Sequence, residues 1–333
     1  MLEDTFARPM RDLRISVTDR CSFRCVYCMP RDQYDDHEYL ARSEILTYDE
    51  IIRFADIVSR FGIAKIRLTG GEPLLRRQIE ILVKGLSEIK GIDDLAMTTN
   101  GQFLAKQANS LAAAGLDRVT VSLDAVDDEV NRQLIDTDLP VSAILEAIDA
   151  ADAAGLGPVK INTVVRRGWN ENQIIPLVDY FRGTGHTVRF IEYMDVGTTN
   201  AWKSDEVIES AQILEILEKR WDLEPLNASY RGEVATRYRF VDGAGEIGFI
   251  SSVSDPFCGD CTRLRLAADG TVYTCLFASE GTDIKTPMRE GATDEEISQI
   301  VAKLWSGRDD RYSELRGSTP LDFPRVEMSY IGG

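Results

Sequence analysis

The residues of this chain best suited to chemistry are its six cysteines, which form two tight groups with none left over. The first group is Cys21, Cys25 and Cys28, spaced CxxxCxxC, and the second is Cys258, Cys261 and Cys275, spaced CxxC with a third cysteine after thirteen residues. Thiolates bind soft metals and iron–sulfur clusters. The spacing therefore predicts two cysteine-ligated centres, one near each end of the chain.

Three kinds of cysteine chemistry compete for these groups. A disulfide framework is typical of short secreted chains, not of a long acidic one. Zinc is the stronger rival, because CxxC is a common half of a zinc site. A structural zinc ion needs four protein ligands, however, and the two histidines, His37 and His186, lie beside neither group. Three thiolates instead suit a cubane iron–sulfur cluster with one iron left open to a small molecule.

The composition limits the classes of function. Among 333 residues, 55 Asp and Glu outweigh 38 Lys and Arg, which gives a formal net charge of -17. Because nucleic-acid recognition requires a basic face, this charge argues against such a partner, although a local basic pocket for a small anion stays compatible with it. No export signal is evident, and no uncharged apolar run reaches about 18 residues. We therefore expect a cytoplasmic protein that binds no nucleic acid and no membrane.

Short β-branched runs alternate with longer amphipathic runs over the first part of the chain. The predicted strands are Leu13–Thr18, Lys65–Thr69, Leu95–Thr99, Arg118–Leu123, Lys160–Val165 and Thr187–Tyr193. The predicted helices are Tyr48–Phe61, Arg76–Lys90, Gln102–Ala114, Val141–Ala154 and Glu171–Arg182. Such alternation predicts parallel βαβ units.

Polar residues follow the carboxyl ends of these strands. The CxxxCxxC motif follows the first strand, Gly70-Gly71-Glu72-Pro73 the second and Asn100-Gly101 the third. In TIM-type barrels the chemistry gathers at this rim. We therefore predict an α/β fold built on a partial, six-stranded TIM-type βα barrel.

The rhythm changes after about Gly197. A predicted helix at Ala211–Lys219 precedes strand candidates at Tyr238–Val241, Ile247–Ser251, Arg263–Leu266 and Val272–Cys275, and an amphipathic run covers Asp294–Leu304. We expect residues 1–197 to form the barrel and residues 198–333 a C-terminal α+β extension that carries the second cluster. The letters GxGxxG at 243–248 fall between two strand candidates, so they predict a hairpin turn and no dinucleotide site.

Two motifs resemble those of a known superfamily. The stretch CSFRCVYCMP at 21–30 resembles the cysteine motif of the radical S-adenosylmethionine (SAM) superfamily, and residues 70–73 resemble its GGEP motif, which supports the methionine amine of SAM. More narrowly, the whole chain resembles the GTP 3′,8-cyclase family of molybdenum cofactor biosynthesis. That resemblance is carried by DRCSFRCVYCMP at 19–30, KIRLTGGEPL at 65–74, FCGDC at 257–261 with Arg-Leu-Arg at 263–265 and Cys275, and the terminal Gly332-Gly333.

This resemblance implies a lyase with two [4Fe-4S] clusters and SAM. In the family, the first cluster binds SAM, and one-electron reduction then cleaves SAM to methionine and a 5′-deoxyadenosyl radical. The second cluster binds the purine of GTP, the radical takes hydrogen from ribose C3′, and C3′ adds to guanine C8 to give 3′,8-cyclo-7,8-dihydro-GTP. The implied partners are an electron donor such as a flavodoxin-type reductant and the next enzyme, cyclic pyranopterin monophosphate synthase, with the chain a monomer or homodimer.

The resemblance also implies roles for individual residues. The implied SAM contacts are Tyr27, Gly71, Ser122 and Met194; the implied GTP contacts are Arg14, Arg67, Thr98, Lys160, Arg263, Leu264 and Arg265; and the implied catalytic residues are Arg14, Arg189, Gly332 and Gly333. The basic residues also make sense unaided, because a triphosphate needs several cations where water is scarce. The nine residues after Pro324 span about 30 Å when extended, enough to bring the terminal glycines to the barrel mouth.

Two alternatives stay open at this point. Another radical SAM enzyme with an auxiliary cluster, such as a maturase that acts on a peptide, generally carries more than three cysteines in its auxiliary domain. A zinc-stabilised binding module would be colourless and indifferent to SAM. The colour and visible absorption of an anaerobic preparation separate the zinc module from the two iron–sulfur enzymes.

Overall fold

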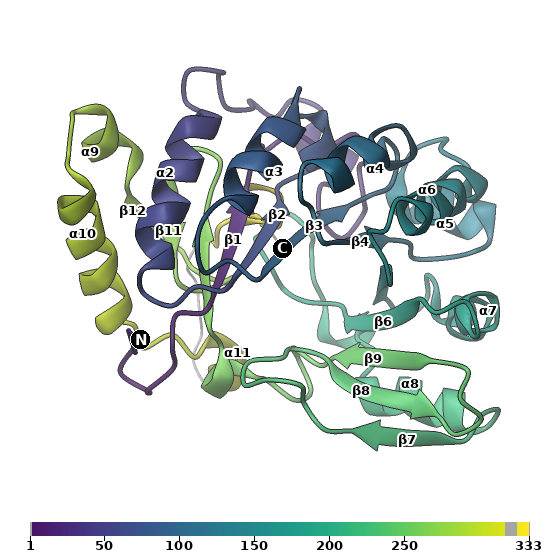
Figure 1. The fold of residues 1–333 in the computed structure, drawn as a ribbon. Helices are drawn as coiled ribbons and strands as arrows, with labels where there is room; N and C mark the ends of the chain where they lie inside the picture. The colour runs from purple at the N-terminus through teal and green to yellow at the C-terminus, as the bar shows by residue number, and fades with distance from the viewer. Residues whose placement is uncertain (1, 317–324, 333) are drawn as a thin grey trace.

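A mixed sheet of 12 strands organises the computed structural model, which describes residues 2–316 and 325–332 (Figure 1). The strand order is β12-β11-β10-β1-β2-β3-β4-β5-β6-β9-β8-β7. The strands are β1 (Asp12–Ser16), β2 (Lys65–Thr69), β3 (Asp94–Thr99), β4 (Arg118–Ser122), β5 (Lys160–Val165), β6 (Thr187–Glu192), β7 (Leu223–Leu226), β8 (Thr236–Phe240), β9 (Glu246–Ile250), β10 (Arg263–Leu266), β11 (Thr271–Tyr273) and β12 (Thr282–Asp283).

The six predicted N-terminal strands are confirmed as β1 to β6, consecutive and parallel. The prediction of a six-stranded sheet is wrong, because the C-terminal part adds three strands to each edge. Strand β10 pairs parallel with β1, and β9 pairs parallel with β6, while the outer strands are antiparallel. The sheet is open, and the expected extension is built into both of its edges. The GxGxxG letters begin in the turn of the β8–β9 hairpin and end in β9, so the predicted hairpin is confirmed.

Helices follow most of the parallel strands. The α-helices are α1 (Arg31–Tyr34), α2 (Tyr48–Ser59), α3 (Ile79–Ser87), α4 (Leu104–Ala113), α5 (Asp128–Ile135), α6 (Val141–Ala153), α7 (Ile174–Phe181), α8 (Ser210–Glu218), α9 (Lys285–Arg289), α10 (Asp294–Ser306), α11 (Tyr312–Leu315) and α12 (Met328–Ile331). Short 3₁₀ turns cover Pro73–Leu75, Glu171–Gln173, Ser204–Glu206 and Cys258–Asp260. The five helices predicted between the strands are confirmed, and α1 and α5 are additional. No helix among the described residues is long and apolar enough to span a membrane.

Capping and packing explain the longer helices. Helix α2 begins with a capping box, in which the Thr47 hydroxyl accepts from the Glu50 amide while the Glu50 carboxylate accepts from Thr47. Helix α10 begins with the same device. Figure 1 places α10 beside α2, where Arg53 Nε donates to Asp294 at 2.8 Å. The predicted C-terminal amphipathic run thus packs against α2, the first long helix of the chain.

Alternation along the strands separates the core from the polar face. In β1, Leu13 and Ile15 are fully buried in the hydrophobic core with the helices, whereas Arg14 between them lines a cavity on the opposite face. The register sets Arg14 directly beside Arg67 of β2 and Arg265 of β10. A row of cations therefore crosses three neighbouring strands.

Candidate active site

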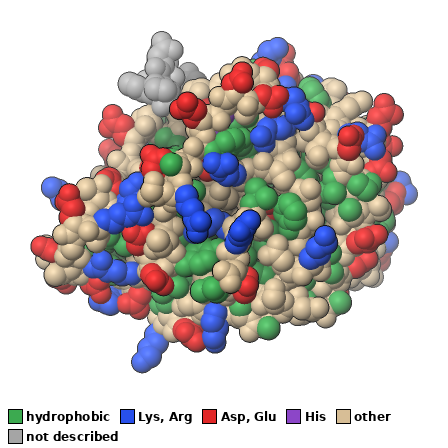
Figure 2. All heavy atoms as spheres, turned by 90° about the horizontal axis from the view of Figure 1, so that it is seen from above, with side chains coloured by type: hydrophobic (Ala, Val, Ile, Leu, Met, Phe, Trp, Pro, Cys, Tyr) green, Lys and Arg blue, Asp and Glu red, His purple; other side chains and the backbone are tan. Residues whose placement is uncertain are grey.

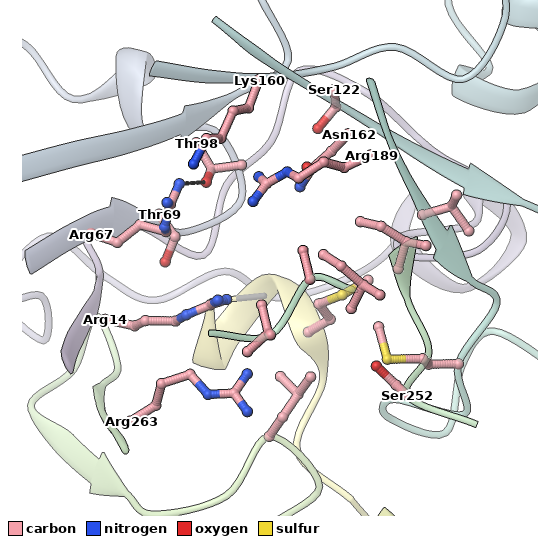
Figure 3. A pocket seen from close by; sticks show the side chains of 18 of the residues that line it. Arg14, Arg67, Thr69, Thr98, Ser122, Lys160, Asn162, Arg189, Ser252 and Arg263 are labelled. Atoms are coloured by element: carbon pink, nitrogen blue, oxygen red, sulfur yellow. Dashed lines mark hydrogen bonds between the residues drawn. The ribbon is translucent and has the colours of Figure 1, made fainter. Parts of the chain in front are cut away.

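A cavity of about 750 Å³ is lined by residues from β1 to β6, β9 and β10 together with both cysteine groups. Figure 3 shows side chains from separate strands converging on it, including Arg14, Arg67, Lys160 and Arg189. Figure 2 shows Lys and Arg side chains at the centre of the face seen from above, although the whole chain is acidic. This acidic chain therefore contains a local basic pocket, which its net charge did not exclude.

Six cations of this cavity, called the cation row below, have no carboxylate partner among the described residues. They are Arg14, Arg67, Lys160, Arg189, Arg263 and Arg265, and the ion pairs found among the described residues involve none of them. By contrast, Lys65 and Arg118, which also line the cavity, both pair with Asp94, at 3.5 and 2.6 Å. Buried charges are normally paired, so six unpaired cations indicate a site for a polyanion.

Two of the unpaired guanidinium groups, those of Arg67 and Arg189, contact neutral hydroxyls. Arg67 Nη1 donates to Thr98 Oγ1 at 3.0 Å and to Thr120 Oγ1 at 3.1 Å, and Arg189 Nη2 donates to the same Thr120 hydroxyl at 3.4 Å. These hydroxyls orient the two arginines without neutralising them. The predicted GTP contact Thr98 therefore acts on Arg67 in this structure.

Burial and mutual repulsion lower the pKa values of several cations of this cavity, Arg14, Arg67 and Lys160 among them. Desolvation, followed by the charges of Arg263 and Arg67, lowers the pKa of Arg14 to about 9. Desolvation and the neighbouring cations lower the pKa of Arg67 to about 9 and that of Lys160 to about 7. A bound anion would relieve both effects, because it would supply the missing countercharge.

The first cysteine group lies on the loop after β1, at one end of the cavity. The amides of Cys28 and Met29 both donate to the Cys25 carbonyl at 2.9 Å, which folds the loop tightly. Tyr27 between these cysteines donates its hydroxyl to Asp124 at 2.6 Å, and this contact fastens the loop to the end of β4. Burial raises the pKa of the Cys25 thiol, and the proximity of Cys21 and Cys28 raises it further.

The loop after β2 packs against the backbone of that cysteine loop. A Cβ at Gly71 would lie 2.2 Å from the Arg20 carbonyl oxygen, so glycine is required by this close approach. The fully buried Glu72 accepts from the Thr99 hydroxyl at 2.8 Å and from the Asn100 amide at 2.7 Å. Glu72 thereby holds together the loops that follow β2 and β3.

The second cysteine group lies beside Arg263, one of the unpaired cations. Arg263 Nη2 donates to Cys261 Sγ at 3.2 Å. Burial raises the pKa of the Cys261 thiol, but the charges of Arg263 and Arg308 outweigh it and lower that pKa to about 6. The thiolate, which is the form that ligates metal, is therefore favoured at Cys261.

Both cysteine groups fit an iron–sulfur cluster better than a single ion. All six thiols are free and line the cavity. Within the described ranges, no three Cys, His, Asp or Glu side chains gather closely enough to hold one metal ion. A cubane cluster presents its irons at separate corners, so its thiolates are spread around it rather than focused on one point. Cys21, Cys25 and Cys28 would hold one cluster, and Cys258, Cys261 and Cys275 the other.

The structure brings most of the predicted site residues to this one cavity. The predicted residues that line it are the six cysteines, Arg14, Tyr27, Arg67, Gly71, Thr98, Ser122, Lys160, Arg189, Met194, Arg263 and Arg265. Leu264 lies instead in the hydrophobic core, as its strand alternation dictates. Gly332 lies against Thr69 and Ser16 and receives a hydrogen bond from Arg265. Gly333 lies outside the described residues.

Several lining residues escaped the sequence analysis. Lys65, Arg118 and Asp94 begin strands, and alternation along β2 to β4 was a signal that could have found them. Tyr230 lies in the loop between β7 and β8, which also lines the cavity, and its hydroxyl accepts from Lys65 Nζ at 3.0 Å. Nothing in the local sequence predicts that this loop returns to the cation row.

Comparison with solved structures shows the fold. A crystal structure of Streptococcus suis SuiB bound to S-adenosylmethionine is similar with a TM-score of 0.62 and 16% identity, over 93% of this chain and 68% of that one. A crystal structure of methylornithine synthase is similar with a TM-score of 0.50 and 16% identity, over 63% of this chain and 62% of that one. At such identities the likeness concerns the arrangement of the elements.

Comparison with protein families and curated relatives shows the family. The Radical SAM superfamily model matches residues 15–181, and the Molybdenum Cofactor Synthesis C model matches residues 186–314. A GTP 3′,8-cyclase of Xanthomonas campestris pv. campestris is 49% identical, covering 100% of this chain and 97% of its own length. Another of Acidothermus cellulolyticus is 47% identical, covering 100% and 99%. Identity of this extent places the chain in the GTP 3′,8-cyclase family of radical SAM enzymes.

Proposed function

We propose that this chain cyclises GTP to 3′,8-cyclo-7,8-dihydro-GTP, the first step of molybdenum cofactor biosynthesis. The observation that carries the proposal is that one cavity is lined by two three-cysteine groups and by six cations that have no ion-pair partner among the described residues. A triphosphate supplies the charge that the cations lack, and each cysteine group leaves one iron of a cubane cluster free for a ligand. The names of the full-length relatives support the same reaction.

The two clusters and SAM supply the one-electron and radical chemistry when they are bound. The protein contributes position, charge and exclusion of water. Near-attack geometry alone can contribute about 7–11 kcal/mol to lowering a barrier, provided that the reacting atoms are held in contact. Because both cysteine groups open into the same cavity, SAM and GTP would meet there without leaving the protein.

The end of the cavity beside Cys21, Cys25 and Cys28 is our proposed SAM site. Tyr27 and Gly71 come from the two loops that pack on each other there, and Ser122 and Met194 come from the ends of β4 and β6. Tyr27 is held by Asp124. The polar groups of these loops would then bind the amino acid and ribose parts of SAM, while Met194 would pack against its apolar surface.

The cation row is our proposed GTP site. Arg14, Arg67 and Lys160 would bind the phosphates, and Arg263 with Arg265 would direct the nucleotide toward the second cysteine group. Arg189 reaches the same region through Thr120. Thr98, and Leu264 through its backbone, complete the proposed GTP contacts. We further propose that Arg14, Arg189 and the tail glycines, Gly332 and Gly333, act at the reacting ribose.

The curvature and division of the chain belong to the same proposal. Side chains from β1 to β6 converge on one cavity, which supports a sheet curled as a partial TIM-type barrel. We propose residues 1–197 as the barrel and residues 198–333 as the extension with the second cluster. The two family models, which meet between residues 181 and 186, support a boundary in this region.

The proposed partners follow from the reaction. The first cluster requires an electron donor, and a flavodoxin-type protein has suitable chemistry. The product would pass to cyclic pyranopterin monophosphate synthase. We propose that the enzyme works in the cytoplasm, because thiolate-held clusters with open irons persist in a reducing compartment. We also propose that it is a monomer or homodimer.

The decisive experiment uses anaerobically reconstituted protein with a reductant, SAM and GTP deuterated at ribose C3′. Mass spectrometry then measures whether 5′-deoxyadenosine gains deuterium. Labelled 5′-deoxyadenosine is expected and would establish the substrate and the abstraction site together. Unlabelled 5′-deoxyadenosine would contradict GTP C3′ as the site. A protein with both clusters intact that forms no 5′-deoxyadenosine would contradict the radical reaction itself.

A further inference from the structure

Two arginines from opposite ends of the chain lie behind the second cysteine group. Arg8 precedes β1, and Arg308 follows α10, yet both are almost completely buried and both line the cavity. The proposed reaction uses neither of them. Their burial is unusual, because arginine is rarely removed from water unless every part of it has a partner.

Arg8 joins three segments that are distant in sequence. Its Nε donates to Asp4 Oδ2 at 2.6 Å, and its Nη1 donates to the carbonyl oxygens of Cys258 and Asp310, each at 2.8 Å. Asp4 in turn accepts from the Arg8 backbone amide at 2.9 Å, so its carboxylate is fixed to both the backbone and the side chain of Arg8. Arg8 thereby ties the first cysteine of the CxxC motif to both ends of the chain.

Arg308 makes the matching contact to the other cysteine of that motif. Its Nη1 donates to the Cys261 carbonyl at 2.7 Å and lies 3.4 Å from Asp4 Oδ2, and its Nε donates to Asp310 at 3.2 Å. The backbone carbonyls of the two cysteines of the CxxC motif are thus held by two different buried guanidinium groups. Asp4, shared by both arginines, sets the distance between them.

One donor of this network is left over. Arg8 Nη2 is buried and has no hydrogen-bond partner among the described residues, although Arg8 lines the cavity. An unsatisfied buried guanidinium N–H is costly, about 1–3 kcal/mol or more for a charged group. A purely structural tie between the termini would not need this donor. An anionic group at the second cysteine site would satisfy it.

We propose that Arg8, together with Arg308, is a positioning residue for the second cluster. By fixing the carbonyls of Cys258 and Cys261, the pair sets the directions of two thiolates before the cluster binds. Their positive charges favour the more negative, reduced state of a thiolate-bound cluster, so they raise its reduction potential. The inference rests on the proposed function, because it requires that the second cysteine group holds a cluster.

The test uses the full chain with Cys21, Cys25 and Cys28 changed to Ala, so that only the second group can be loaded. Iron and sulfide content and an EPR-monitored redox titration are measured after anaerobic reconstitution. The test variant is Arg8→Met, which removes one positive charge while Asp4 keeps its contact with Arg308 at 3.4 Å. The control is Arg231→Met. Arg231 pairs with Asp260 at 2.8 Å inside the same CxxC loop, but more than half of each side chain is exposed.

We expect Arg8→Met to bind less iron, or to be reduced at least tenfold less readily at a given potential, which is 59 mV for one electron. The control should load and titrate like its parent. Arg8→Lys keeps the charge but lacks the planar fork that reaches Asp4 and the carbonyls of Cys258 and Asp310 together. It should titrate close to the parent with reduced iron content, and this variant decides the matter if Arg8→Met does not fold. Full loading of both variants at an unchanged potential would overturn the inference. A parent that binds no iron–sulfur cluster would instead overturn the proposed second cluster.

Discussion

Arg265 donates from Nη1 to the carbonyl oxygen of Gly332, with 2.5 Å between the two atoms. This contact joins the C-terminal tail to β10, and it engages an arginine that we propose as a GTP contact. Burial and the charges of Arg14 and Arg263 lower the pKa of Arg265. The Gly332 carbonyl is a neutral acceptor, so it orients the guanidinium while leaving its charge for a nucleotide. The tail therefore helps to position a cation that lines the cavity.

The first prediction concerns the size of residue 332. A Cβ there would lie 2.1 Å from Thr69 Oγ1, and the backbone has φ of 77°, a conformation that costs a non-glycine residue about 1–2 kcal/mol. We expect Gly332→Ala to displace the tail from Arg265 and to lower turnover of GTP at least tenfold. Deleting residues 332 and 333 should abolish turnover. Turnover is measured as cyclised product, alongside the iron content of each protein.

The matched control for that prediction is Gly291→Ala. Gly291 has φ of 95°, but nothing lies within 4 Å of the Cβ position, so the backbone strain is similar without a clash. This variant should lose some stability and keep its turnover. If Gly332→Ala or the truncation turned over GTP at the normal rate with both clusters assembled, the tail would have no role in catalysis.

The second prediction separates the two cysteine groups. Cys25→Ala removes a ligand beside the proposed SAM site, so we expect it to stop formation of 5′-deoxyadenosine. Cys258→Ala removes a ligand of the other group, which lies beside Arg263 of the cation row, so its main effect should be the loss of productive GTP binding. SAM cleavage and GTP binding are measured separately under anaerobic conditions. Full turnover by Cys258→Ala would contradict the substrate role of the second group.

The fold shows what local sequence patterns can and cannot predict. Strands β1 to β6 were predictable, because period-two alternation and intervening amphipathic runs depend on neighbouring residues. The same alternation explains why Arg14 faces the cavity while Leu13 and Ile15 face the core. The sites of β9 and β10 were also predictable as strands. Their pairing with β6 and β1 was not, because parallel pairing across so long a stretch of chain leaves no local signal.

The site divides in the same way. The cysteines and the GGEP loop are contiguous motifs, so the sequence locates them. Asp4 and Arg8, by contrast, meet Arg308 only through folding, and nothing in their spacing distinguishes them from a surface ion pair. Tyr230 is a similar case, since a loop between two edge strands returns to Lys65. Residues whose partners are distant in sequence were the ones that sequence reasoning missed.

The third prediction is a pH dependence of GTP binding. Burial, followed by the charge of Arg189, lowers the pKa of Lys160 to about 7 in the free protein. As the pH rises through 7 the lysine loses its proton, so binding of a triphosphate must then take up a proton. We expect affinity for GTP to fall between pH 7 and 9 by up to about tenfold per pH unit from this residue. Calorimetry in buffers of different ionisation enthalpy measures the proton uptake directly.

Two variants check that the effect comes from Lys160. Lys160→Arg keeps its charge over this range, so its affinity should be nearly independent of pH. Lys160→Met should bind GTP weakly at every pH and take up no proton. A wild-type profile that is flat from pH 7 to 9, with no proton uptake, would contradict the assignment of Lys160 to the phosphate site.

The last prediction concerns how the tail is held in place. Glu327 accepts from the amide and the hydroxyl of Thr198, at 2.8 and 2.9 Å, and from the Thr199 hydroxyl at 2.8 Å. These contacts fasten the tail to the loop that follows β6, near Met194. We expect Glu327→Ala to release the tail, to raise the KM for GTP several-fold and to lower kcat, while both clusters still assemble. Glu327→Gln, which keeps one acceptor oxygen, should have KM and kcat values between those of Glu327→Ala and the wild type.

Release of the tail can be measured independently of activity. Limited proteolysis followed by mass spectrometry should detect faster cleavage near residue 326 in Glu327→Ala than in the wild type, because a detached segment is accessible to protease. Glu295→Ala, at an exposed position on α10, is the control and should match the wild type in both assays. Normal kinetics together with faster cleavage would mean that the tail acts without being docked on the β6 loop. That result would leave Arg265 as the contact that positions Gly332.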